Sequence, residues 1–130
     1  MRASSVKTFP EAVPQEWIAA AEMESFTPGE QSFTALAEDR FPISVVSVDL
    51  VQPPKRKRGV VGLNRERSIS ILNAFRMKAA LPAIEVDEAP KLGQYRYRVR
   101  DGYHRFHLAV AVGYSKLPVS VRPYFDIDNC

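Results

Sequence analysis

The stretch that decides the fold is residues 95–121, which read YRYRVRDGYHRFHLAVAVGYSKLPVSV. Tyrosine or valine alternates with arginine over 95–100, and this two-residue period predicts a strand. Asp-Gly then breaks the pattern. A helix is predicted over 103–112 because the segment is mostly apolar and Gly113 follows it, as glycine commonly does past a helix end. A second short strand is predicted over 117–121.

The turn at Gly102 lies where a strand gives way to a helix. The first N–H groups of a helix have no partner within it, and the helix dipole adds partial positive charge there. Glycine allows a ligand close to the backbone, and His104 and Arg105 add cationic donors in the first turn. A phosphate site is therefore one interpretation. The other is a plain structural junction, because many Asp-Gly turns bind nothing.

Residues 99–121 resemble the signature of the ParB/sulfiredoxin fold family. Its members carry a strand, a Gly-x-His-Arg or Gly-Glu-Arg-Arg turn, an apolar helix, a glycine and an Ile/Leu-Pro-Val strand. Earlier segments match in order: SVDLVQP at 47–53 resembles the opening strand, and LPAIEV at 81–86 resembles a Pro-Pro-Ile-x-Val strand. The resemblance implies an α+β fold, with a small mixed sheet of four or more strands packed with helices. It does not fix the function, because one fold hosts many chemistries.

Residues 1–42 are expected to form an N-terminal arm and two short helices that lie outside the resemblance. The first helix is predicted over 14–23, opened by proline. The second is predicted from a Thr27 cap to about residue 40. It should bury three apolar side chains, Phe33, Leu36 and Ala37. This helical pair is interpreted as a cap on the sheet, with a dimer surface or a partner-binding element as the alternatives.

Residues 43–130 are expected to form the ParB/sulfiredoxin-like domain as a single compact unit. A half-buried strand is predicted over 43–51. Asn64 is the expected N-cap of a helix over 65–80, and a strand over 83–87 should pair with 95–100 as a hairpin. The helix should bury a stripe formed by Ile69, Leu72, Phe75 and Ala79.

Composition places the chain among globular proteins, with 130 residues, 45% hydrophobic and 25% charged. Its apolar runs fall short of the roughly 18 residues typical of a membrane span. Its start lacks the apolar region of a secretory signal. Cys130 is the single cysteine, so no internal disulfide is expected. We therefore expect a cytoplasmic protein without a membrane partner.

The charge is unevenly divided along the chain. Residues 1–50 hold 3 Lys/Arg and 8 Asp/Glu, a net of −5, whereas residues 51–130 hold 15 and 7, a net of +8. This division indicates self-association or an acidic segment near a basic site. A protein partner for the acidic N-terminal helices is left open.

The first basic stretch is Lys55-Arg56-Lys57-Arg58. A solvated loop and a nuclear-localisation signal are two interpretations. A loop that contacts phosphate is favoured, because the resemblance implies that this segment folds over the phosphate site. Arg56 and Arg58 are assigned to the nucleotide, and Lys55 and Lys57 to nucleic acid, although the sequence alone does not say which of the four points inward.

The second basic stretch is the stripe of Arg96, Arg98 and Arg100 on one face of the predicted strand. A solvated sheet face is the favoured interpretation. The alternative is a groove for the nucleic-acid backbone.

Both histidines, His104 and His107, lie one helical turn apart. No third ligand lies near them in the sequence, so no metal centre is predicted. His107 is interpreted as a partly buried neighbour. The resemblance assigns His104 to phosphate binding.

At several positions this sequence differs from the motifs of the family, and these differences argue against some of the family's functions. Tyr103 stands where sulfiredoxins have their reactive cysteine, and the glutamate that partition proteins carry after the glycine is missing. Sulfinic-acid reduction is therefore disfavoured. The chain ends before any helix-turn-helix, so a full-length partition protein is not expected. The match is nearer to stand-alone members that act as phosphotransferases, ATPases or nucleases.

Two function classes stay open. The favoured one is an enzyme that binds ATP or CTP with Mg²⁺ and hydrolyses or transfers the terminal phosphate. Asp101 and His104 are its catalytic candidates, and the phosphate would lie at Gly102, Tyr103, His104 and Arg105. Asp101 can also be a turn or N-cap residue. The alternative is a non-catalytic DNA-binding or partner-inhibiting protein of a plasmid, phage or genomic island.

Overall fold

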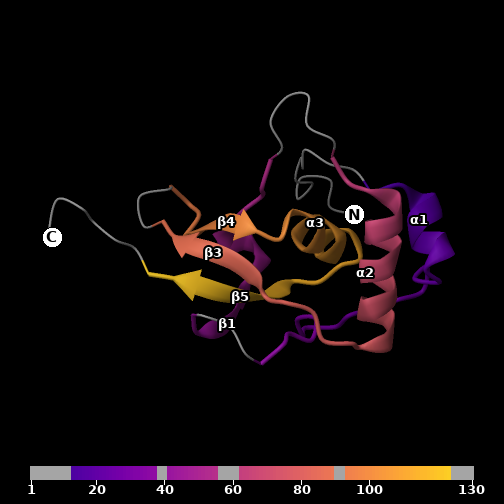
Figure 1. Ribbon diagram of the computed structural model, residues 1–130, viewed down its shortest axis with the longest axis horizontal. Coiled ribbons are helices and arrows are strands. Elements are labelled where there is room, and N and C mark those ends of the chain that lie inside the picture. Colours follow the sequence, from indigo (N-terminus) through magenta and orange to yellow (C-terminus); the bar gives the residue numbers. More distant parts are fainter. Residues whose placement is uncertain (1–12, 38–40, 56–61, 90–92, 124–130) are drawn as a thin grey trace, which may run out of the picture.

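The computed structural model describes residues 13–37, 41–55, 62–89 and 93–123. It has the predicted α+β class, with a curled sheet, α3 packed beside it, and α2 and α1 beyond (Figure 1). The elements in chain order are α1 (Gln15–Ala20), β1 (Ile43–Ser47), the 3₁₀ turn η2 (Val48–Leu50), β2 (Val51–Gln52), α2 (Arg65–Met77), β3 (Ile84–Glu88), β4 (Tyr97–Asp101), α3 (Tyr103–Ala111) and β5 (Lys116–Arg122). No helix in these described ranges has the length and apolarity that a bilayer crossing requires.

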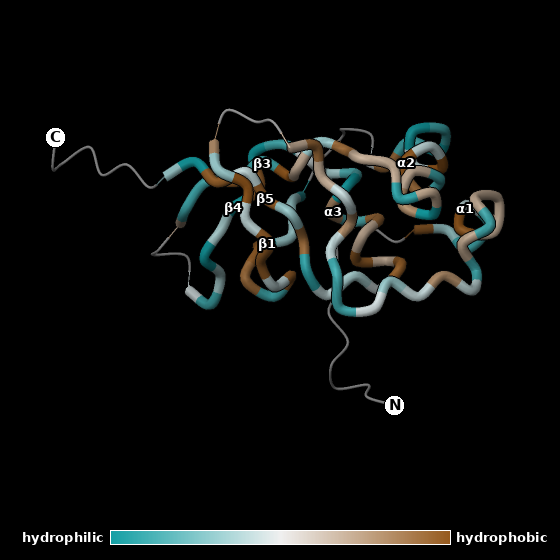
Figure 2. The backbone as a smooth tube through the Cα atoms, turned by 90° about the horizontal axis from the view of Figure 1, so that it is seen from below, coloured by the Kyte–Doolittle hydropathy of each residue, from teal (hydrophilic) through white to brown (hydrophobic). Residues whose placement is uncertain are grey.

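The sheet is mixed and five-stranded, in the order β1-β5-β3-β4-β2. The predicted hairpin is confirmed, because β3 and β4 pair antiparallel. Strands β3 and β5 pair in parallel, β1 joins β5 antiparallel, and β2 joins β4 in parallel. Hydrophobic and hydrophilic residues are interspersed along the sheet (Figure 2). Burial alternates along β3, whereas β5 buries four residues in succession, 117–120.

The single strand predicted over 43–51 is wrong. The η2 turn interrupts it at Val48, where the Ser47 hydroxyl accepts a hydrogen bond from the Asp49 N–H at 3.3 Å. Short serine and aspartate side chains favour such local turns over a continued strand. As a result β1 and β2 lie at opposite edges of the sheet.

Helix α3 is the central helix, as predicted. Seven of its residues in succession, 103–109, are buried. Phe106, Leu108 and Ala109 belong to a core shared with the sheet strands and with α2. Three of the seven, His104, Arg105 and His107, are polar, and their side chains form hydrogen bonds with other segments.

Helix α2 begins as predicted and ends early. The Asn64 side-chain oxygen accepts from the Arg67 N–H at 2.8 Å, which confirms the N-cap. The helix ends at Met77, because Lys78 adopts a left-handed conformation. Ala79 therefore lies beyond the helix and is exposed, against the prediction. The buried residues of α2 are Ser68, Ile71, Leu72 and Phe75, with Ile69 only partly buried.

The N-terminal helical pair is only half present. Helix α1 forms, but the described residues 27–37 contain no second helix. This segment instead pairs with the residues before β3: Leu36 N–H donates to Leu81 O at 2.8 Å, and Leu81 N–H donates to Thr34 O at 3.0 Å. Phe33 is buried as predicted, whereas Leu36 is 45% exposed and Ala37 is also exposed. Backbone pairing with a distant segment therefore overrides the local capping signal.

Candidate functional site

A cleft of about 350 Å³ opens at the start of α3, between the end of β4, the residues after β2 and the first turn of α2. Four cationic residues line it, Lys55, Arg67, Arg100 and Arg105, together with one carboxylate among the described residues, Asp101. Gly102, Tyr103 and His104 complete the α3 side. The turn singled out in the sequence therefore lines a cavity.

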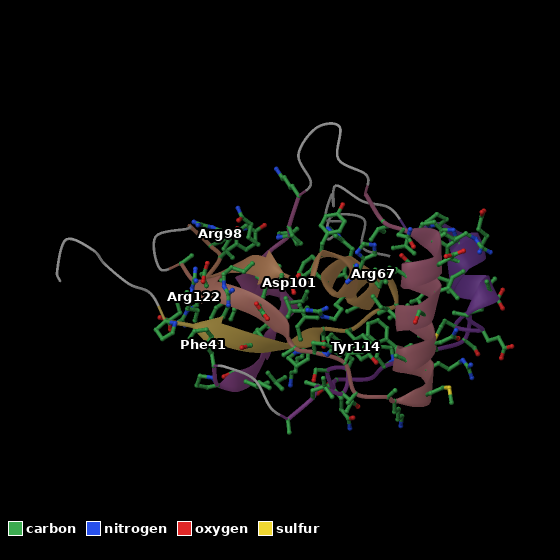
Figure 3. The ribbon with its side chains drawn as sticks, in the orientation of Figure 1. Phe41, Arg67, Arg98, Asp101, Tyr114 and Arg122 are labelled. Atoms are coloured by element: carbon green, nitrogen blue, oxygen red, sulfur yellow. The ribbon has the colours of Figure 1, made fainter. Side chains whose placement is uncertain are left out.

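The electrostatics of the cleft favour an anion. Four positive side chains meet a single carboxylate there, and the N-terminal end of the α3 dipole adds further positive potential. In Figure 3, Arg67 on α2 and Asp101 at the end of β4 lie to either side of α3. The charges come from β4, α2, α3 and the segment after β2, so the fold rather than one motif assembles the site.

Gly102 is required by the geometry of the turn. Its φ is 125°, and an added Cβ would lie 3.0 Å from Ile84 Cγ2 and 3.3 Å from Arg105 Nη2. Its carbonyl accepts the first helical hydrogen bond, from Phe106 N–H at 2.8 Å. Only glycine combines this backbone conformation with such a close approach of neighbouring side chains.

Asp101 does not cap α3. The N-cap position is Gly102, and α3 has no side-chain capping hydrogen bond. Asp101 is instead the last residue of β4, with a 71% exposed side chain whose Oδ2 lies 3.9 Å from Arg105 Nη2. The interpretation of this aspartate as an N-cap is therefore wrong, and its carboxylate stands at the cleft.

Arg105 is buried, with only 8% of its surface exposed. Its Nη2 donates a hydrogen bond to Ala83 O at 3.3 Å, just before β3. This guanidinium therefore ties α3 to the sheet as well as lining the cleft. Replacing Arg105 would test folding and ligand binding together.

The two histidines bond to backbone atoms of distant segments. His104 Nε2 accepts a hydrogen bond from the Asn64 N–H at 2.9 Å. His107 Nε2 lies 2.9 Å from Pro54 O, and because a carbonyl oxygen only accepts, the His107 ring donates. His104 thus does not donate to a phosphate through Nε2 in this arrangement. Tyr103 is buried beside them, its ring meeting that of His107 edge-on at 4.7 Å.

The arginine stripe, which begins at Arg96 just before β4 and continues into that strand, divides into two parts. Arg100 is paired across the sheet with Glu85 at 3.2 Å and with Asp87 at 3.1 Å. Asp87 also binds Arg122 of β5. Arg96 and Arg98 have exposed side chains. Part of the stripe is therefore a network of ion pairs on the sheet, which the sequence analysis did not predict.

The sequence analysis did not identify Arg67 as a site residue, and three of the site residues that it did predict lie outside the described residues. Arg67 stands three residues after the Asn64 cap, in the turn of α2 that faces the cleft. Its spacing from the cap was the only sequence signal for it. Lys55 lies at the cleft, whereas Arg56, Lys57 and Arg58 fall outside the described residues. Among the described residues no group of three or more His, Cys, Asp or Glu side chains is placed to hold a metal ion.

Comparisons with known proteins give limited matches. No family model matches the chain, and no curated protein matches it. Among solved structures it is similar to the C-terminally truncated chromosome-partitioning protein ParB from Caulobacter crescentus, complexed with CTP-gamma-S. The identity is 22%, the TM-score is 0.49, and the match covers 66% of this chain and 47% of that one. The chain thus spans about half the length of that protein.

Proposed function

We propose that this protein binds a nucleoside triphosphate, with the phosphates held in the cleft at the start of α3. The proposal rests on the charge of the cleft, where Lys55, Arg67, Arg100 and Arg105 face a single described carboxylate. Arg100 is already paired with two carboxylates on its own sheet face. Lys55 and Arg67, both exposed, are therefore the principal phosphate ligands.

Two helices begin at this cleft, which favours a polyphosphate over a single phosphate. Helix α3 contributes its first turn, and α2 contributes Arg67 from its own first turn. The hydrogen bond between Asn64 and His104 holds the two helix starts together. The positive ends of two helix dipoles then act on the same volume.

The residues present also fit Mg²⁺ carried in with the phosphates. This cation usually takes one or two carboxylates, with phosphate oxygens and water for the rest. Asp101, exposed at the cleft, is the residue that would hold it. When bound, Mg²⁺ neutralises charge on the phosphates.

Hydrolysis or transfer of the terminal phosphate is the favoured activity. Such reactions depend mainly on positioning and on neutralising charge. Lys55 and Arg67 supply the charge, and Asp101 is the candidate base or metal ligand. ATP and CTP are both candidate nucleotides. A non-catalytic protein would bind the same phosphates without turnover.

The proposal is tested with a thermal-shift panel of ATP, ADP, CTP and GTP, with and without Mg²⁺. A ligand at 100 times its dissociation constant stabilises the native state by about 2.7 kcal/mol. Arg67→Ala should lose a charge-assisted contact and bind about tenfold to a hundredfold more weakly. Arg65→Ala, from the same helical turn but outside the cleft, is the matched control. Equal affinities of the two variants, or no shift with any nucleotide, would contradict the proposal.

A further inference from the structure

Two buried histidines on α3 each contact one of the segments that bring a cation into the cleft. His104 is 7% exposed and His107 is 3% exposed. They lie one helical turn apart, so their side chains leave the same side of α3. Neither ring bonds to its own element through Nε2, because both partners are backbone atoms of remote segments.

His107 holds the segment that follows β2. Its Nε2–H donates to Pro54 O at 2.9 Å. Lys55, the next residue along the chain, lines the cleft. One hydrogen bond therefore fixes the backbone from which this lysine side chain extends.

His104 holds the start of α2 through a ring nitrogen that accepts a hydrogen bond rather than donating one. Its Nε2 accepts from the Asn64 N–H at 2.9 Å, so this nitrogen carries no proton. The Asn64 side-chain oxygen in turn accepts from the Arg67 N–H at 2.8 Å. Two successive hydrogen bonds thus join His104 to the backbone of the second exposed cation.

We propose that His104 and His107 are positioning residues for the phosphate cleft, His104 for Arg67 and His107 for Lys55. This inference rests on the proposed function. Arg100 and Arg105 have carboxylates beside them, whereas Lys55 and Arg67 are exposed cations that line the same cleft and repel each other when no anion is bound. The two histidine bonds oppose that repulsion by fixing both segments to α3. The preformed arrangement lowers the ordering cost of binding phosphate.

The test uses inorganic tripolyphosphate as the probe and titration calorimetry as the readout, in two double-mutant cycles. His104→Leu and His107→Leu should each weaken tripolyphosphate binding about tenfold. Each removes a hydrogen bond that orders the segment carrying a cationic side chain, Arg67 or Lys55. When Arg67 is already alanine, His104→Leu should weaken tripolyphosphate binding by less than about a further twofold. The same is expected of His107→Leu when Lys55 is already alanine. The crossed pairs, His104→Leu with Lys55→Ala and His107→Leu with Arg67→Ala, should be additive.

Conservative variants separate positioning from simple loss of fold. In His104→Gln the side-chain oxygen can accept from Asn64, and in His107→Gln the amide can donate to Pro54, so both should keep affinity within about threefold. Nitrogen-15 NMR of the wild-type rings gives a readout that needs no ligand. At neutral pH His104 should carry its proton on Nδ1 and His107 on Nε2.

Additive losses in the matched pairs would overturn the inference and assign the histidines to the ligand itself. The same tautomer for both rings would also overturn it. If the wild-type protein binds tripolyphosphate while the cycles are additive, only the positioning roles fail. If the wild-type protein binds neither tripolyphosphate nor any nucleotide, the proposed function fails and the positioning roles fail with it.

Discussion

The sequence predicts that Asp101 is either a catalytic residue or a turn or cap residue, and the structure shows that it does not cap α3. Its carboxylate makes no capping bond to α3 and lies 3.9 Å from a buried arginine at the cleft. The Asp101 side chain is 71% exposed and the pair is long, so solvent screens it and it contributes little to stability. The carboxylate is therefore free to serve the ligand rather than the fold.

Asp101→Ala should leave the free energy of unfolding within about 0.5 kcal/mol of the wild type, because no cap is lost. The additional stabilisation that Mg²⁺ gives to a bound nucleotide should disappear, and any turnover should collapse. Urea denaturation and the nucleotide thermal-shift panel measure the two effects. A loss of about 1 kcal/mol with unchanged nucleotide affinity would instead indicate a structural role.

Tyr114 predicts how stability depends on alkaline pH. Burial raises the pKa of Tyr114 above its ordinary value, since the neutral phenol lies among the rings of Phe26, Phe33 and Phe75. The pKa of Tyr114 in the folded protein lies above its value in the unfolded chain. The contribution of the neutral phenol to the free energy of unfolding is therefore complete below about pH 10 and is lost as the pH rises through the folded pKa. Stability should therefore fall above about pH 10.

Urea denaturation between pH 8 and 11 checks this prediction. Tyr114→Phe should flatten the alkaline decline. Tyr95→Phe, outside the aromatic cluster, is the control and should retain it. An identical decline in both variants would exclude Tyr114 as its source.

At the scale of helices and strands, local sequence signals predict some elements correctly and others wrongly. The sequence pattern predicts α3, β5 and the β3–β4 hairpin, because their apolar periods and glycine turns act over a few residues. The second N-terminal helix fails because Leu36 pairs with Leu81, 45 positions away. Arg67 escapes prediction for the same reason, since its place at the cleft depends on the bond between Asn64 and His104.

Strand β4 carries the nucleic-acid prediction. If Arg96 and Arg98 contact DNA phosphates, replacing both with alanine should reduce the slope of log affinity against log salt by roughly 2. Arg100→Ala should change the slope less, because Glu85 and Asp87 already neutralise that charge. Fluorescence anisotropy with labelled duplex DNA over a salt series measures the slopes. Absence of binding at low salt would leave Arg96 and Arg98 as surface charges.

At the scale of the whole molecule, the N-terminal segment is part of the core. Ala21, Met23 and Phe33 are buried in the same cluster as Phe75 and Tyr114. Arg76 of α2 also donates to Ala21 O at 3.1 Å. The segment outside the sequence resemblance therefore packs against α2 and stabilises the helix that carries Arg67.

Phe33→Ala should lower the free energy of unfolding by about 3–5 kcal/mol, since it removes a buried ring and leaves a cavity. Leu36→Ala, at a 45% exposed position of the same segment, should cost less than about 1 kcal/mol. Guanidinium denaturation of both variants measures the difference. Similar small losses would mean that the segment packs only loosely on the rest of the protein.

The pairing of β1 with β5 has a consequence for synthesis on the ribosome. Strand β1 ends at Ser47, and its partner β5 begins at Lys116, 69 positions later. At roughly 5–20 residues per second, β1 waits about 3–14 s for that partner to be made. During this interval Val45 and Val46 lack their partners in β5. The nascent chain therefore exposes both edges of β1 to chaperones until β5 emerges.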